Sequence, residues 1–248
     1  MKLARLIEDF EEECGVCATP GELFDLTEAA ARDLGFDRLA MVHSLWFRCP
    51  EKRLIRLDNF GEFADLFITR KYYQYDPALL ACQRINTAFT WTQMCKLIRF
   101  DRRHEVVLRE AGRHGLCIGM SLPVSVVGEP PGCVSFATRN AALPSRWRCR
   151  AAALIGASAF REARRLHGYP GRAMQLPHLS PRKLEILQLA ALGKTDPEIS
   201  IILGLARSTI ETYMTQLRQT FDVYSRTQLC VAALRFGLIA FDDAISGF

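Results

Sequence analysis

Residues 179–248 carry four sets of helix start signals, and these constrain the fold more than any other feature of the chain. The first is Ser180–Pro181, because serine is a favoured N-cap and proline a favoured first helical residue. The other three have the spacing of capping boxes, in which the cap residue and the residue three positions later each accept the other's backbone N–H. They are Thr195–Glu198, Ser208–Glu211 and Ser225–Gln228. Short helices are stable only when they pack together, so the sequence predicts a four-helix domain over 179–248.

The second and third of these helices, separated by a tight turn after Gly204, have the pattern of a helix-turn-helix. The third helix has an apolar face of Ile210, Met214, Leu217 and Phe221. Its opposite face is polar and consists of Glu211, Thr212, Thr215, Gln216, Arg218 and Gln219. Glutamine and arginine can bond base edges and threonine can contact the thymine methyl, so this face is a candidate for the DNA major groove. The residues alone also fit a helical bundle whose polar face meets only water.

Several segments of this domain resemble the LuxR-type DNA-binding domain, over residues 179–240. They are Leu179–Leu187, Gly193–Ser200, Thr209–Glu211 and Arg226. The resemblance implies that a helix from Ser208 to Phe221 enters the major groove of double-stranded DNA, with Lys194 and Thr209 near phosphates. The residues expected to contact DNA are Lys194, Ser208, Thr209, Thr212, Thr215, Gln216, Arg218 and Gln219.

Three positions depart from that family's usual pattern. Ala206 stands where the family usually has serine or threonine, so we expect the helix cap to shift to Ser208. Tyr213 and Thr220 stand where the family often has histidine and a basic residue. The recognition helix is therefore poor in positive charge, which predicts weak electrostatic affinity per monomer. A homodimer would compensate by raising the effective concentration of the second domain, and it would read an inverted-repeat operator.

The residues before this domain alternate helix and strand patterns. Helical patterns cover 2–13, 20–34, 61–73, 101–112 and 145–166, and strand-like runs cover 36–45, 52–57, 116–127 and 133–138. Two glycines and two prolines interrupt these patterns over 167–178, which indicates a linker. We therefore expect an α/β sandwich over 1–166, a linker over 167–178, and an all-α helix-turn-helix domain over 179–248.

Charge and composition argue against several function classes. The net charge is +5, and the excess precedes the last domain, where residues 145–178 hold seven arginines against the single acid Glu162. The sequence shows no carboxylate cluster of a phospho-acceptor site, no nucleophile–base set and no metal-ligand set, so we expect neither phosphorelay control, nor an enzyme, nor a cofactor. It also has no bilayer-spanning run and no signal-peptide pattern, which predicts a cytoplasmic protein without membrane contact.

The chain has nine cysteines, which is an odd number. One pair, Cys14 and Cys17, has C-x-x-C spacing, but it lacks a second pair or a nearby histidine, so a zinc or redox site there is weakly supported. Free, mostly buried thiols in a reducing compartment fit this pattern better.

An aromatic stretch leads to a second candidate site. Phe63 and Phe67 are one helical turn apart, Asp76–Pro77 follows, and Trp91 lies fifteen residues after the aspartate. The phenylalanines fit an ordinary core, and Asp76 before proline fits a helix N-cap. These structural roles explain the residues without any ligand.

The same spacing resembles the autoinducer-binding domain of the LuxR-type receptors for acyl-homoserine lactones. The resemblance continues through Gly119–Pro123 and Ser135, and it implies an α/β/α sandwich with a buried small-molecule signal. By this resemblance Asp76 would accept the ligand's amide N–H, Trp91 would pack on the lactone, and Ser135 would bond the acyl carbonyl. The expected ligand-binding residues are Phe63, Phe67, Asp76, Trp91, Ser121 and Ser135.

Two departures leave the ligand open. Phe63 and Phe67 stand where the family has a tryptophan and a tyrosine that donate hydrogen bonds to ligand carbonyls, and phenylalanine has no donor. The effector could be an acyl-homoserine lactone, including an aryl- or branched-acyl one, or a non-lactone signal. A third hypothesis is a ligand-free interaction module that antagonises a related regulator. We also expect the helix over 145–166 to contribute to a homodimer.

Overall fold

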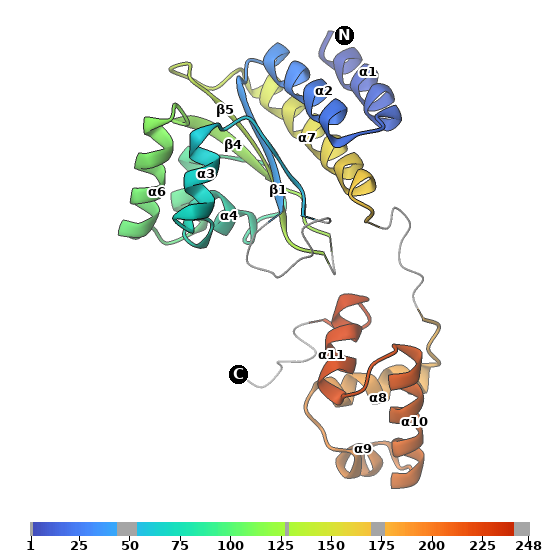
Figure 1. Ribbon diagram of the computed structural model, residues 1–248. Coiled ribbons are helices and arrows are strands. Elements are labelled where there is room, and N and C mark those ends of the chain that lie inside the picture. Colours follow the sequence, from blue (N-terminus) through green and yellow to red (C-terminus); the bar gives the residue numbers. More distant parts are fainter. Residues whose placement is uncertain (1, 44–53, 127–128, 170–176, 241–248) are drawn as a thin grey trace. The chain divides into compact units, whose positions relative to one another are not determined.

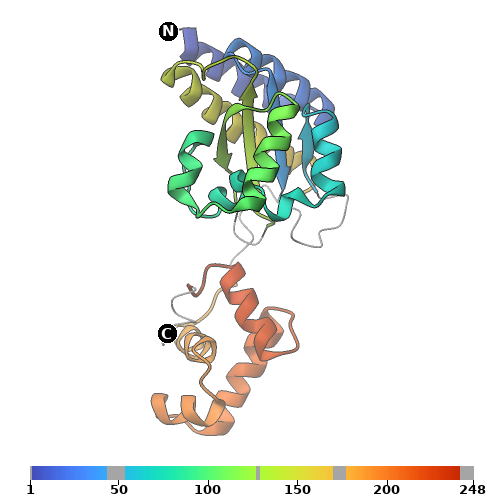
Figure 2. The same ribbon diagram turned by 90° about the vertical axis from the view of Figure 1, so that its left-hand side faces the viewer.

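The computed structural model describes residues 2–43, 54–126, 129–169 and 177–240. The chain divides into two compact units, Met1–Gly171 and Arg172–Phe248, seen from two directions in Figures 1 and 2. Each unit has its own hydrophobic core. Within the described residues, no helix is both long enough and apolar enough to cross a membrane. The expected α/β unit followed by a four-helix unit is confirmed.

A five-stranded antiparallel sheet is the middle layer of the first unit, in the order β2-β1-β5-β4-β3. Its strands are β1 (Arg38–His43), β2 (Arg56–Asp58), β3 (Phe89–Thr90), β4 (Ile118–Pro123) and β5 (Gly132–Thr138). Every residue of the central strand β5 is buried, because helices cover both faces of the sheet (Figure 1).

Four of the five strands agree with the sequence prediction except at their ends. β1, β4 and β5 lie at the expected runs, although β1 begins at Arg38 and β4 spans only Ile118–Pro123. Residues 44–45 and 127 of the runs expected over 36–45 and 116–127 are outside the described residues. β2 lies at the end of the run expected over 52–57, of which residues 52–53 are outside the described residues. Residues 170–176, most of the linker expected over 167–178, are also outside the described residues. β3 was not predicted, because two residues are too few to show a strand's alternation.

One face of the sheet is covered by α1 (Lys2–Val16), α2 (Pro20–Asp33) and α7 (Arg146–Leu166) (Figure 1). Gly156 allows α7 to approach β5 closely, since a Cβ there would lie 3.0 Å from the Phe136 ring and 3.1 Å from Val134. Phe136 and Ile155 are fully buried between these layers. This face is a tightly packed core.

The other face is covered by α3 (Glu62–Thr69), α4 (Pro77–Cys82), α5 (Met94–Leu97) and α6 (Arg102–Arg113), with the 3-10 turns η2 (Tyr72–Gln74) and η3 (Trp91–Gln93). The prediction of one helix over 61–73 is wrong. Lys71 has a left-handed backbone with φ 55°, so the α-helix ends before it and a separate turn follows. The break returns the Tyr72 ring to within 6.5 Å of the Phe63 ring.

The second unit consists of α8 (Pro181–Ala191), α9 (Asp196–Leu203), α10 (Arg207–Thr220) and α11 (Arg226–Arg235). The predicted caps at Ser180, Thr195 and Ser225 are confirmed, the last two as full capping boxes. Gly204 ends α9 in the left-handed conformation, with φ 63°. The predicted apolar face of α10 is also confirmed, because Ile210, Met214 and Leu217 are buried and Phe221 packs on their cluster.

The predicted shift of the α10 cap to Ser208 is wrong. Ala206 is the N-cap residue, α10 begins at Arg207, and no side chain caps it. The partner expected for Ser208, Glu211, is instead held by Arg207 at 2.9 Å. Leu205 packs on the core directly after Gly204, so the chain enters the helix at once and Ser208 lies inside the first turn.

The missing cap gives a testable stability change. We expect Ala206→Ser to raise the free energy of unfolding of the second unit by about 1 kcal/mol, because a hydroxyl there can accept a first-turn N–H. The mirror change Ser225→Ala removes a cap whose Oγ accepts the Gln228 N–H at 3.1 Å, and should lower stability by a similar amount. Urea unfolding followed by circular dichroism measures both. An Ala206→Ser protein no more stable than the parent would show that this N-terminus does not need a side-chain cap.

Candidate functional site

A cavity of about 90 Å³ lies between the sheet and the helical layer of α3, α4 and α6. Five of the six residues predicted to bind a ligand line it, and they come from α3, the start of α4, η3 and β5. They are Phe63, Phe67, Asp76, Trp91 and Ser135. Packing of separate segments, and not one continuous motif, therefore brings these side chains together.

Asp76 has two structural roles at once. It is the N-cap of α4, where its Oδ1 accepts the Leu79 N–H at 2.8 Å, and it also borders the cavity. Burial raises the pKa of its carboxyl to about 6, while N–H bonds from Leu79 and Ala78 act in the opposite direction. The helix-cap prediction is thus confirmed. It does not exclude a ligand contact, because a carboxylate can accept several hydrogen bonds.

Ser121 lies behind the cavity wall. The β4–β5 register sets it opposite Ser135, and the two hydroxyl oxygens are 2.8 Å apart. Ser121 Oγ also accepts the Trp91 indole N–H at 3.0 Å. Gly119 leaves room for this ring, since a Cβ there would lie 2.8 Å from two of its carbons. Ser121 thus orients Trp91 and Ser135.

The phenylalanines form an apolar wall. Phe63 is only 4% exposed, and its ring centroid lies 5.9 Å from that of Phe67 and 6.5 Å from that of Phe60. His114 lies 6.0 Å away on the α6 side. This wall supplies contact area and no hydrogen-bond donor to the cavity.

The structure adds polar cavity residues that the sequence did not indicate. His43 ends β1, and Arg56 and Asp58 lie on the paired strand β2. Arg56 is 3.4 Å from Asp58 and 3.5 Å from Asp65, and His43 Nδ1 lies 3.4 Å from the Tyr169 hydroxyl. Only strand pairing brings these residues to one site, so no local sequence pattern could have identified them.

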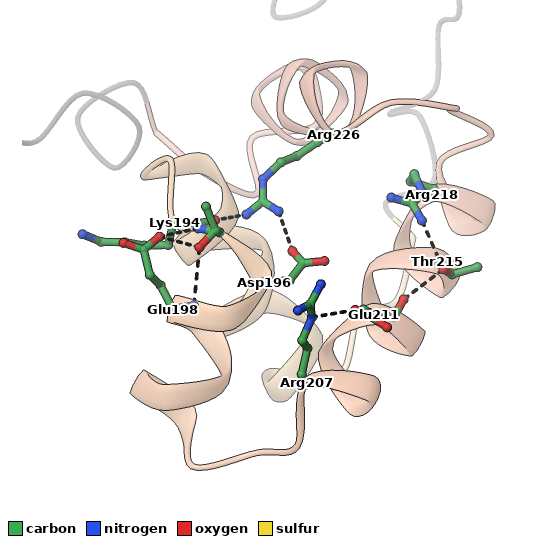
Figure 3. Close-up of polar contacts among 9 residues, drawn as sticks. Lys194, Asp196, Glu198, Arg207, Glu211, Thr215, Arg218 and Arg226 are labelled. Atoms are coloured by element: carbon green, nitrogen blue, oxygen red, sulfur yellow. Dashed lines mark hydrogen bonds and ion pairs between the residues drawn. The ribbon is translucent and has the colours of Figure 1, made fainter.

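The exposed face of α10 carries the predicted base-reading residues. The Thr212 hydroxyl bonds the Ser208 carbonyl at 2.8 Å. The Thr215 hydroxyl bonds the Glu211 carbonyl at 2.9 Å, and Arg218 donates to Thr215 Oγ1 at 3.1 Å (Figure 3). Gln216 and Gln219 are exposed on the same helix. Ser208 and Thr209 lie in the first turn, where the Thr209 N–H donates to the Ala206 carbonyl at 3.0 Å.

Arg226 fixes the turn that carries Lys194. Its guanidinium donates to Asp196 Oδ1 at 2.6 Å and also to the Lys194 carbonyl (Figure 3). The same turn is also stabilised by the Thr195–Glu198 capping box, in which each side chain accepts the other residue's backbone N–H. The exposed Lys194 side chain therefore extends from a well-braced backbone next to the helix-turn-helix.

Comparison with known protein families matches both units. Residues 19–163 match the family described as autoinducer binding domain, and residues 177–233 match that of bacterial regulatory proteins, luxR family. The chain belongs to the LuxR family of regulators with an autoinducer-binding domain. It is a transcription regulator of the quorum-sensing type and not an enzyme. Among the described residues, no three or more His, Cys, Asp or Glu side chains are grouped so that they could hold a metal ion.

Individual relatives of this LuxR-family chain extend over most of its length. It is 28% identical over 233 residues to the HTH-type quorum-sensing regulator RhlR of Pseudomonas aeruginosa, covering 88% of this chain and 89% of the relative. It is 27% identical over 178 residues to the quorum sensing-dependent regulator RpaR of Rhodopseudomonas palustris, covering 72% of each chain.

Two solved structures share the fold. SdiA of Escherichia coli, in complex with octanoyl-rac-glycerol, matches with a TM-score of 0.62 at 20% identity, covering 96% of this chain and 97% of the other. CepR2 of Burkholderia cenocepacia, an N-acylhomoserine lactone dependent factor, matches with a TM-score of 0.52 at 14% identity, covering 64% of this chain and 96% of the other.

Proposed function

We propose that the unit over 1–166 binds a small signal in its cavity and thereby controls DNA binding by the unit over 179–248, the two being joined by a linker at 167–178. The observation that carries this is the convergence of Phe63, Phe67, Asp76, Trp91 and Ser135 on one cavity. In this proposal Asp76 accepts a ligand N–H, Trp91 packs on the ligand head, and Ser135 bonds a ligand carbonyl. Ser121 orients Trp91 and Ser135 through its hydrogen bonds to both.

The proposed ligand is an acyl-homoserine lactone or a related small signal with an N–H for Asp76. The buried carboxylate favours a ligand N–H, because a hydrogen bond to a charged acceptor is stronger than a neutral one. The apolar wall favours a ligand that presents fewer carbonyl groups at Phe63 and Phe67. A second candidate function, favoured by the same Phe63 and Phe67, is that of a regulator that responds to a non-lactone signal.

A thermal-shift assay on the full chain tests ligand binding. A ligand that binds only the folded state raises the melting temperature, and the shift grows with ligand concentration. We expect a shift from a member of a lactone panel or from an extract of the native organism. Melting that no lactone and no extract changes would support the third hypothesis, the ligand-free interaction module.

The proposed DNA interface combines phosphate and base contacts. Ser208 and Thr209 lie in the first turn of α10, and Lys194 directly precedes the N-cap of α9. The N-terminus of a helix attracts phosphate. The base-reading residues are Thr212, Thr215, Gln216, Arg218 and Gln219. Since Thr212 and Thr215 already bond the helix backbone, their methyl groups are the parts offered to thymine. The protein acts in the cytoplasm on an inverted-repeat operator.

We expect the triple change Thr215→Ala, Gln216→Ala and Gln219→Ala to lower discrimination between operator and scrambled DNA by about tenfold or more, since a good base contact contributes about 1–3 kcal/mol. Gel-shift titrations with both DNAs measure it. Lys194→Ala should weaken binding to both equally, and Thr227→Ala, exposed on α11, should change neither. A triple variant with unchanged discrimination would mean that another side of α10 faces the groove.

The proposed homodimer uses the exposed face of α7. Trp147 is 66% and Leu154 54% exposed, and Arg150 stacks over the Trp147 ring at 4.8 Å. The three residues recur at helical spacing on one side of α7. A stripe of exposed tryptophan, arginine and leucine fits a surface that meets a partner, because aromatic residues and arginine are enriched at protein interfaces.

We expect Leu154→Asp to convert a dimer into a monomer, because it places a charge on this stripe. Multi-angle light scattering of the full chain, with and without operator DNA, measures the mass. Val106→Asp is the matched control, since Val106 is 46% exposed on α6, away from α7. A parent chain that is monomeric both on and off DNA would refute the proposed homodimer.

A further inference from the structure

Two cysteines that are 51 positions apart in sequence lie in contact. Cys82 is the last residue of α4 and Cys133 is the second residue of β5, and their sulfur atoms are 3.3 Å apart. A disulfide bond is about 2.05 Å long, so an approach of little more than 1 Å would join them. Helix packing on the sheet has already brought both thiols within reach of a covalent link.

Other thiols of the described chain have different partners. Five of them lie within hydrogen-bond distance of backbone carbonyl groups, at 3.4 to 3.6 Å, and these are Cys14, Cys17, Cys95, Cys117 and Cys149. Cys14 and Cys17, despite their C-x-x-C spacing, each bond a backbone carbonyl of α1. The sulfur–sulfur contact therefore distinguishes Cys82 and Cys133 from these cysteines.

We propose that Cys82 and Cys133 are a modification site, at which a two-electron oxidant such as hydrogen peroxide converts two thiols into an intramolecular disulfide. Cys82 is half-buried and Cys133 is fully buried, so the oxidant reaches Cys82 first. Peroxide oxidises the Cys82 thiol to a sulfenic acid and leaves as water. The Cys133 sulfur then attacks the Cys82 sulfur, the S–O bond breaks, and a second water carries away the thiol proton.

Solvent access, and not electrostatics, sets this order, because the raised pKa of Cys82 makes it the weaker thiolate of the pair. The Cys82 S–H donates to the Cys133 sulfur, which lowers the pKa of Cys133 despite its burial and raises the pKa of Cys82. Cys133 is thus the better thiolate of the two before oxidation, and its 3.3 Å contact with the Cys82 sulfur places it to attack that sulfur once Cys82 is oxidised.

The link would act on the wall of the cavity without touching a ligand. Asp76 caps the other end of the helix that ends at Cys82, and Cys133 lies 3.5 Å from the hydroxyl of the cavity residue Ser135. Ser135 in turn bonds Ser121, which holds Trp91. A disulfide would fix α4 against β5 between Asp76 and Ser135, two of the proposed ligand contacts.

Mass spectrometry of the full chain tests the proposal without any ligand, so its outcome is independent of the proposed function. Native protein is treated with hydrogen peroxide, its remaining thiols are alkylated, and its peptides are mapped. We expect a peptide pair cross-linked through Cys82 and Cys133, with a mass about 2 Da below the sum of the two free peptides, that dithiothreitol separates. Cys82→Ser and Cys133→Ser should each abolish the cross-link.

Cys95→Ser is the matched control, because it removes an exposed thiol outside the pair and should leave the cross-link intact. The exposed Cys95 and Cys117 also report whether oxidant was present at an effective dose. The proposal fails if these two become oxidised while Cys82 and Cys133 are recovered as separately alkylated thiols. It also fails if the Cys82 cross-link joins a different cysteine.

Discussion

Asp76→Asn is expected to raise the ligand concentration for half-maximal response by about 10- to 100-fold while the protein still folds. Asparagine is as good an N-cap as aspartate, so the bond to the Leu79 N–H and the start of α4 are retained. The amide oxygen can still accept a ligand N–H, but it lacks the negative charge. Hydrogen bonds to charged groups contribute about 1.5–3 kcal/mol, and most of that contribution is lost. An operator-linked reporter titrated with ligand measures the shift.

Asp101→Asn is the matched control for this substitution. Asp101 caps α6 by accepting the Arg103 N–H at 2.8 Å and the His104 N–H at 3.2 Å, and it does not line the cavity. Its replacement tests the cap role alone, and the response should not change. If Asp76→Asn and Asp101→Asn both respond like the parent, Asp76 is only a helix cap and is not a ligand contact.

The Asp76→Asn variant also has an expected pH signature in the absence of ligand. Because the folded-state pKa of Asp76 is raised from 3.8 to about 6, folding disfavours its ionised form. The free energy of unfolding of the parent is therefore unaffected by this group below about pH 4. It falls as the pH rises through about 6, because the buried carboxyl then ionises. The asparagine amide cannot ionise, so the variant should be more stable than the parent by about 1–3 kcal/mol above pH 6 and nearly equal to it at pH 4. Urea unfolding from pH 4 to 8 measures this difference.

The double change Phe63→Trp and Phe67→Tyr is expected to alter ligand response by about tenfold or more, and its sign identifies the ligand class. The variant restores the indole N–H and the phenol O–H that related receptors offer to ligand carbonyls. If the signal is an ordinary acyl-homoserine lactone, two new hydrogen bonds of about 1 kcal/mol each should increase sensitivity. If the signal lacks these carbonyls, the new polar groups are buried without partners, and sensitivity should fall.

The two single variants complete a double-mutant cycle that separates lost packing from gained hydrogen bonds. Phe63 is the more constrained position, because it is 4% exposed and lies among four other aromatic rings. Phe67→Tyr alone is therefore the gentler test. Each variant is titrated with a lactone panel and with an extract that contains the native signal. Unchanged response to both in all three variants would show that these positions do not contact the ligand.

Local signals in the sequence predicted the elements that depend on local chemistry. The caps at Ser180, Thr195 and Ser225 were found because a cap and its N–H partner lie within three residues. The start of α10 was misplaced, because packing of Leu205 and not a side-chain cap decides it. The break at Lys71 was missed, because lysine rarely adopts a left-handed backbone and gives no warning of it.

The candidate cavity was predictable only in part. The spacing of Phe63, Phe67, Asp76, Trp91 and Ser135 identified five lining residues, and the structure brings them together. Ser121 does not line the cavity, because the β4–β5 register directs its hydroxyl toward Trp91 and Ser135. His43 and Arg56 reach the cavity only through pairing of β1 with β2, which no short sequence window contains.

Small-molecule mass spectrometry of the purified full-length protein tests the ligand-controlled function most directly. The chain is purified from its native host, its bound compounds are extracted, and the Asp76→Asn variant is treated in the same way. We expect one compound with an N–H group, an acyl-homoserine lactone or a related molecule, in the parent and much less of it in the variant. A parent protein that binds its operator specifically but releases no compound would contradict control by a cavity-bound signal.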